Sequence, residues 1–177
     1  MRQYERLARA ERMLPRFLAS LDGWTSLDVN YQPPRVERLW RQMGDERMFI
    51  HRLHPCAERE VLFHPHGGPS EMLVIDGTYR MLVGSGEGVQ PPVVVLDLEF
   101  EATPQWPLRY KMDHPNGWHA VIPVGGPVYT LMVTGIPWQR EIPTVSREAS
   151  GTLPPLSQEA QEDLLKAFAA RWIQRSH

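Results

Sequence analysis

Cysteine is almost absent from the chain, and so are the features of secreted and membrane proteins. Cys56 is the single cysteine among 177 residues, so no intramolecular disulfide can form, which is usual in reducing compartments. We interpret Cys56 as an inert, half-buried thiol rather than a nucleophile. No apolar run approaches the roughly 20 residues of a membrane helix, and the Arg-rich N-terminal segment lacks the apolar core of a signal peptide. These absences predict a cytoplasmic protein without a membrane partner.

An excess of charge of one sign is also lacking. The 19 Lys and Arg residues nearly balance the 21 Asp and Glu residues, which leaves a formal net charge of −2. A nucleic-acid groove needs a concentrated basic surface, so we expect no nucleic-acid partner and take a small molecule as the ligand. With 42% hydrophobic and 23% charged residues, the composition is typical of a globular chain with a sizeable core, and we predict a single domain over residues 1–177.

Two segments at the ends of the chain show the apolar spacing of helices. In residues 1–22, apolar side chains recur at close to helical intervals, although Pro15 is expected to kink or divide the helix. In residues 156–174, an apolar stripe runs through the segment and Ser157 is placed to cap its start. We expect both helices to pack against the outside of a β core.

Between these ends the pattern changes to short extended segments separated by Gly, Pro, Asn and Asp. Residues 36–40 and 48–53 are predicted to form a hairpin around Gly44 and Asp45. Further strands are expected at residues 61–66, 71–75, 78–83, 93–100, 109–112, 119–123 and 128–135. Seven or more short strands predict an all-β fold closed as a barrel or sandwich, with its core at about residues 35–140.

The segment Phe-His-Pro-His-Gly-Gly-Pro-Ser-Glu at residues 63–71 carries the clearest chemical signal. Residues two apart on an extended strand project to the same face, so His64 and His66 can approach one ion. Glu71 adds a nearby carboxylate, and His119 adds a third imidazole downstream. The pattern indicates a metal inside a β-barrel, and imidazole ligands suit Fe(II), Mn, Ni, Cu or Zn.

Two short segments resemble the two sequence motifs of the cupin superfamily: His64-Pro65-His66 with Glu71 and Gly77, and Pro115-Asn116-Gly117-Trp118-His119. Members of that superfamily fold as an antiparallel double-stranded β-helix barrel, and many bind one divalent metal through two His and one Glu of the first motif and one His of the second. The resemblance covers residues 61–135. It implies a cupin-like barrel with His64, His66, Glu71 and His119 as metal ligands.

The register of the first motif leaves two ligand sets open. The family usually has six residues between the Glu and the closing Gly, whereas Glu71 leaves five before Gly77 and Ser70 leaves six. Because strand side chains alternate between faces, a slip of one residue would direct Glu71 away from the metal unless a bulge restores it. The alternatives are three histidines with Glu71, and three histidines with Ser70 near the fourth position.

Several other residues are candidates for the site. His51 shares strand parity with hydrophobic neighbours, so it either faces the barrel interior as a catalytic candidate or lies on the outer surface. Trp118 is the second catalytic candidate, because it directly precedes His119 and can line the pocket. An inward-facing Arg38 would favour a carboxylate-bearing substrate, whereas an outward-facing one would be solvated. His114 is interpreted as a loop residue because Pro115 follows it.

These residues support three functional hypotheses. The first is a mononuclear Fe(II)-dependent dioxygenase of a small organic acid or thiol, with Mn, Ni or Zn as other metals to consider. The second is a metal-dependent isomerase or lyase in which a side chain such as His51 moves a proton. The third is a noncatalytic small-molecule binding protein. The cupin resemblance and the exposed edge expected of a sheet are compatible with a homodimer.

Overall fold

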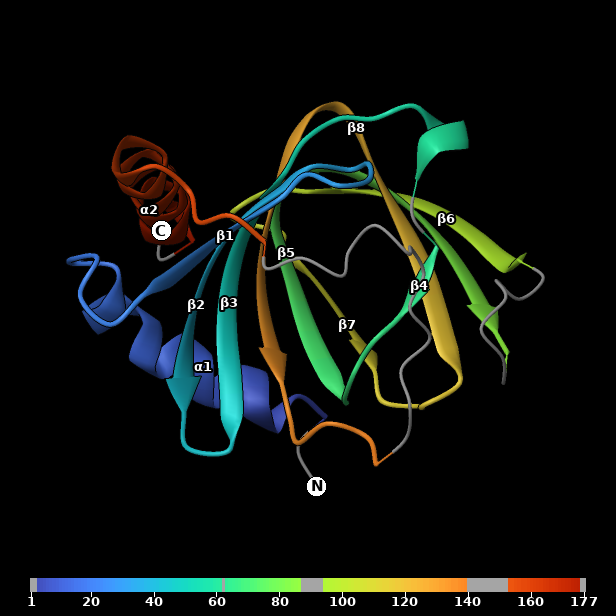
Figure 1. Cartoon of the computed structure of the whole chain (residues 1–177), viewed down its shortest axis with the longest axis horizontal. Coiled ribbons are helices and arrows are strands. Elements are labelled where there is room, and N and C mark those ends of the chain that lie inside the picture. Colours follow the sequence, from blue (N-terminus) through green and yellow to red (C-terminus); the bar gives the residue numbers. More distant parts are fainter. Residues whose placement is uncertain (1–2, 62, 87–93, 140–152, 176–177) are drawn as a thin grey trace.

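The fold is all-β and cupin-like, an antiparallel barrel with one helix near each end of the chain (Figure 1). The computed structural model describes residues 3–61, 63–86, 94–139 and 153–175. The helices are α1 (Glu5–Phe17) and α2 (Gln158–Gln174), with a short 3-10 helix at Glu58–Glu60. The strands are β1 (Thr25–Val29), β2 (Val36–Met43), β3 (Glu46–Leu53), β4 (His64–Pro65), β5 (Ser70–Ser85), β6 (Val94–Ala102), β7 (Leu108–Met112) and β8 (Gly117–Thr134).

The long strands β5 and β8 pair along their whole length and divide the barrel into two connected layers. The first part of β5 pairs with the last part of β8, and this layer continues through β3, β2 and β1 on one side and β7 on the other. The second part of β5 pairs with the first part of β8, and here β4 and β6 are the flanking strands. Both long strands therefore contribute side chains to both walls of the interior.

Each long strand bends where its two parts meet. The β5–β8 register shifts on either side of Asp76, and Gly77 (φ 110°) and Gly125 (φ 73°) adopt backbone conformations that favour glycine. The shift also reverses the alternation: Ser70 and Met72 line the interior before the bend, and Tyr79 does so after it. Sequence spacing predicted separate strands at 71–75 and 78–83 and at 119–123 and 128–135, because the glycines that bend a long strand resemble those that end a short one.

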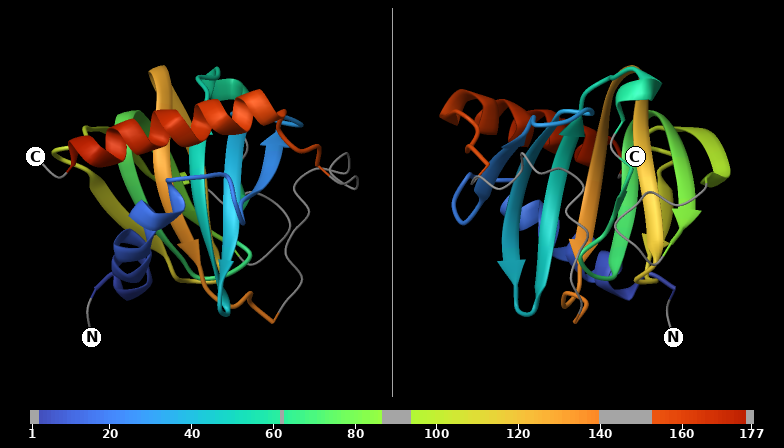
Figure 2. Two further views of the ribbon diagram at one scale, coloured as in Figure 1. Left: turned by 90° about the vertical axis from the view of Figure 1, so that its left-hand side faces the viewer. Right: turned by 45° about the vertical axis from the view of Figure 1, so that its right-hand side comes forward.

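Both helices cover the outer face of the layer that contains β2, β3 and β5 (Figure 2). Leu7 and Leu14 of α1 and Phe168 of α2 are fully buried against outward-facing strand residues such as Ile50 and Leu131. The two predicted terminal helices are confirmed. Pro15 does not divide α1, because it stands close to the C-terminal end, where the helix continues for only two further residues. Ser157 caps α2 as expected, since its hydroxyl accepts a hydrogen bond from Ala160 N at 3.2 Å.

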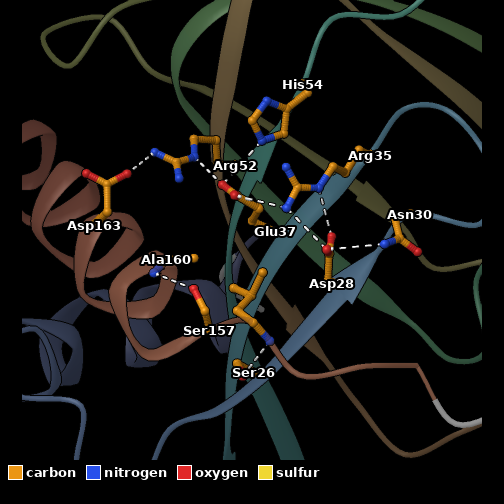
Figure 3. A network of polar contacts seen from close by, with 11 residues as sticks. Ser26, Asp28, Asn30, Arg35, Glu37, Arg52, His54, Ser157, Ala160 and Asp163 are labelled. Atoms are coloured by element: carbon orange, nitrogen blue, oxygen red, sulfur yellow. Dashed lines mark hydrogen bonds and ion pairs between the residues drawn. The ribbon is translucent and has the colours of Figure 1, made fainter.

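A network of polar contacts joins the hairpin of β2 and β3 to α2 (Figure 3). The buried Glu37 carboxylate pairs with Arg52, and Arg52 Nη1 lies 2.6 Å from Asp163 Oδ2 on α2. Strand β1, which sequence patterning did not predict, extends this layer at its edge, and Ser26 Oγ accepts a hydrogen bond from Leu156 N just before α2. None of the described helices is long and apolar enough to span a membrane.

Candidate metal centre

His64, His66 and His119 come together on the inner wall of the barrel, and this predicted convergence is confirmed. Strand β4 lies beside β8 with His64 directly opposite His119, and His66 follows two residues later on the same side. One nitrogen atom from each ring lies within 4.8 Å of the others, and the Nε2 atoms of His66 and His119 are 2.8 Å apart. We call these residues the three-histidine cluster.

Within the three-histidine cluster, His66 and His119 have the spacing of two ligands on a single metal ion. Two nitrogens bound at about 2.0–2.2 Å and at right angles would lie about 2.8–3.1 Å apart, which matches the separation of the His66 and His119 Nε2 atoms. His119 Nδ1 is buried and has no hydrogen-bond partner among the described residues. A metal on Nε2 would therefore determine which nitrogen of His119 keeps its proton.

Electrostatics favours the neutral form of the His66 and His119 imidazoles, which is the form that binds metals. Burial, followed by the nearby His64 and Arg38, lowers the pKa of His66 to about 3. Burial and the neighbouring His66 and His64 also lower the pKa of His119 well below its ordinary value. Ring lone pairs are thus available for an ion at neutral pH.

The three-histidine cluster opens into a cavity of about 440 Å³. Residues of the two layers face each other across it, and most of its wall is apolar, including Phe49, Met72 and Val121. No aspartate or glutamate lines this cavity in the part of the chain that the structure describes. The only cationic side chains in its wall are Arg38 and Arg47, among the same residues.

The structure does not bring Glu71 to the three-histidine cluster. Its carboxylate faces α1, where Oε2 accepts a hydrogen bond from Leu7 N at 2.8 Å and Oε1 lies 3.5 Å from Arg6 Nη1. The preceding Ser70 lines the cavity, with its hydroxyl donating to Gly68 O at 3.1 Å. No bulge in β5 precedes the bend, so alternation directs Ser70 inward and Glu71 outward. The geometry thus favours the alternative with Ser70 beside three histidines.

His51 faces the cavity, but both of its ring nitrogens are engaged. Nε2 accepts a hydrogen bond from Arg38 Nε at 3.0 Å, and Nδ1 lies 3.0 Å from Thr130 Oγ1. Because arginine only donates, the proton of neutral His51 is on Nδ1 and points to Thr130. Burial and Arg38 lower the pKa of His51 well below its ordinary value. This arrangement makes His51 a support for Arg38 and leaves no ring nitrogen free to move a substrate proton.

Trp118 does not line the cavity, although the sequence made it a catalytic candidate. Its neighbour His119 points inward, so alternation directs the Trp118 ring to the other face of β8. There it is fully buried, stacks on Phe63 at 6.0 Å between ring centroids, and donates from Nε1 to Gly86 O at 3.1 Å. Trp118 therefore packs the barrel wall behind the three-histidine cluster.

Two further polar residues of the barrel lie away from the cavity. His114 lies in the turn before β8, as predicted, and its Nδ1 accepts a hydrogen bond from Asn116 N. Arg80 faces outward and pairs with Asp97.

Sequence analysis missed two polar residues of the interior, Thr130 and Tyr110. Thr130 is fully buried and faces His51 across β3 and β8, where the two are register partners. The Tyr110 hydroxyl lies 2.8 Å from the Tyr79 hydroxyl, and the Tyr110 ring is 6.3 Å from that of His119. No local pattern identifies either residue, because their partners are set by strand register.

Comparison with known proteins supports the fold alone. No family model matches the chain, and no curated protein matches it. A crystal structure of Fe(II)-HppE with the alternative substrate (S)-1-HPP has a TM-score of 0.50 at 11% identity and covers 65% of this chain and 57% of that one. Hydroxypropylphosphonic acid epoxidase from S. wedmorenis has a TM-score of 0.47 at 11% identity, covering 65% and 56%.

A third similar structure is AerE from Microcystis aeruginosa, with a TM-score of 0.46 at 15% identity, covering 65% of this chain and 48% of that one. The present chain thus spans roughly half the length of the structures that it resembles.

Proposed function

We propose that this chain is a mononuclear metal-dependent enzyme, and specifically a non-haem Fe(II) dioxygenase of a small organic acid or thiol. One observation carries the proposal: three imidazoles meet at the wall of a mostly apolar cavity of about 440 Å³. The proposed ligands are His64, His66 and His119. Glu71 is not among them, because its carboxylate is engaged with α1.

His64, His66 and His119 would hold a divalent metal beside the cavity. Such a metal would bind and activate a substrate donor and dioxygen. The apolar wall excludes water from that space and strengthens the electrostatic interactions within it. The similarity to an Fe(II)-HppE structure makes iron the first metal to test.

The remaining hypotheses differ in what they require of the cavity. An isomerase or lyase needs a side chain that moves a proton, and the engagement of both His51 nitrogens counts against the candidate named for that role. A noncatalytic binding protein needs only the cavity. Metal content and oxygen consumption separate these possibilities.

The experiment begins with metal analysis of protein purified without a chelator. The apoprotein is then loaded anaerobically with Fe(II), and oxygen uptake is followed in an electrode with a panel of thiols and aliphatic and aromatic acids. The proposal predicts one iron per chain and uptake that His66→Ala abolishes and Glu71→Gln retains. Stoichiometric zinc or nickel without uptake would favour the isomerase or lyase, and the absence of any metal binding would favour the binding protein.

A further inference from the structure

We infer that Arg38 is the anchor for an anionic group, so that the molecule bound in the cavity carries a carboxylate at one end and a metal-binding donor at the other. The inference rests on the proposed function, because it assumes a metal at the three-histidine cluster. It goes beyond that function by naming the charge of the substrate and the residue that recognises it.

Arg38 lies inside the cavity without a carboxylate partner. Its strand, β2, directs Val36 and Arg38 inward and Glu37 outward toward α2. The guanidinium carbon lies 5.3 Å from the centroid of the Phe49 ring, and Nε donates to His51. Among the described residues Arg38 forms no ion pair, whereas the outward-facing Arg52 and Arg80 each pair with two carboxylates.

The surroundings of Arg38 make an unpaired charge costly. Burial lowers the pKa of Arg38 to about 10, so the side chain is still protonated at neutral pH but loses part of its hydration. A half-buried cation of this kind is stabilised by an anion that it can contact through two parallel N–H groups. The Nη1 and Nη2 groups are suited to that contact, because Nε is already directed at His51.

His51 and Thr130 hold the guanidinium in place. The chain of contacts runs from Arg38 Nε to His51 Nε2 and from His51 Nδ1 to Thr130 Oγ1, across three adjacent strands. Both His51 and Thr130 are buried. A side chain fixed in this way loses little further freedom when it binds a ligand, which favours recognition of one group in one orientation.

The charge balance of the whole cavity also indicates an anionic ligand. Two arginines and no acidic residue line it among the described residues, so its wall carries positive charge without a protein carboxylate to offset it. A divalent metal would add two more positive charges with no protein carboxylate to offset them. An anionic ligand that reaches both the metal and Arg38 supplies the missing negative charge, and a cavity equal to roughly fifteen water volumes accommodates a small organic acid.

The test uses a matched pair of probes, mercaptoacetate and mercaptoacetamide, which share the thiol and differ in the carboxylate. Binding of each probe to the Co(II)-loaded full chain is followed by the change in the cobalt absorption spectrum. The variants are Arg38→Met and Arg38→Gln, of which the second keeps a polar side chain at His51. Arg47→Met is the matched control, since it removes an arginine from the exposed rim of the same cavity.

We expect the preference for mercaptoacetate to fall at least about tenfold in both Arg38 variants while Co(II) affinity stays within about twofold, and to persist in Arg47→Met. An unchanged preference in a folded Arg38 variant overturns the inference and leaves the metal site standing. If the wild type binds no Co(II), the proposed function fails. The anchor is then tested on the metal-free protein by calorimetry with benzoate and benzamide, where equal binding of the two refutes it.

Discussion

The Glu71 carboxylate accepts a hydrogen bond from the backbone N–H of Leu7, 64 positions earlier in the chain, at 2.8 Å. Leu7 lies in the first turn of α1, where backbone N–H groups have no partner within the helix. The residue before the helix, Tyr4, provides no side-chain cap. Glu71 therefore caps α1 from strand β5, with its negative charge at the positive end of the helix dipole.

The first prediction concerns the stability of this contact. Glu71→Ala should lower the free energy of unfolding by about 1–3 kcal/mol, because it leaves the buried N–H of Leu7 without an acceptor. Urea denaturation followed by circular dichroism measures the change. Glu71→Gln retains an acceptor oxygen and should lose less. Stability equal to the wild type in Glu71→Ala would show that water replaces the carboxylate at no cost.

The second prediction compares Glu71 with a residue of the three-histidine cluster. His66→Ala should weaken Co(II) or Fe(II) binding by more than about 100-fold, since it removes a ligand, whereas Glu71→Ala should change metal affinity by less than about threefold. Competition with a chromophoric chelator gives both values. Equal losses in the two variants would falsify the assignment of Glu71 to helix capping and restore it to the metal site.

The third prediction tests the support of Arg38 by His51. His51→Leu removes the acceptor of the Arg38 Nε–H and should reduce the preference for mercaptoacetate roughly fivefold, the value of about one hydrogen bond. His51→Gln keeps an acceptor and should preserve most of the preference, and Thr130→Val should give an intermediate result. A purely structural role for His51 would lower the melting temperature of all three variants without changing the ratio of the two probe affinities.

The fourth prediction uses three glycines near the bend as a graded series. A Cβ at Gly77 would lie 2.9 Å from Pro127 O at a φ of 110°, one at Gly125 would meet nothing within 4 Å at a φ of 73°, and one at Gly126 would meet nothing within 4 Å. Substitution by alanine should therefore cost most at Gly77, about 1–2 kcal/mol at Gly125, and least at Gly126. Thermal unfolding of the three variants ranks them, and a different order would contradict the steric explanation.

The outcomes for neighbouring residues show which parts of the site follow from sequence. Alternation along a strand is local, so the shared face of His64 and His66 and the shared face of His51 and Phe49 were predictable. The orientations of Glu71 and Arg38 could not be predicted. Alternation assigns side chains to two faces of a strand, and only the packing of α1 and α2 on one of them shows that the other is the interior. The competing possibilities for Ser70 and Glu71 were correctly posed from the spacing, but the absence of a bulge before Asp76 is visible only in the register of β5.

Contacts between residues on different strands could not be predicted from the sequence either. Trp118 was expected near the cavity because it is adjacent to His119, yet adjacency in a strand places side chains on opposite faces. Thr130 meets His51 because β3 and β8 pair in one register out of several that their hydrophobic patterns would allow. Such pairings depend on contacts between segments far apart in the chain, and no local pattern encodes them.

The bend in β8 has a consequence for which molecules can fit. His119 lies before Gly125 and Thr130 lies after it, so one strand carries both a member of the three-histidine cluster and the residue that braces the Arg38 support. The angle of the strand at Gly125 and Gly126 sets the separation of the two ends of the cavity, and with it the length of molecule that can span them. Under the proposed function, the backbone at this bend in β8 would limit the length of the substrate, and changes there could alter that length while the side chains of the cavity wall stay the same.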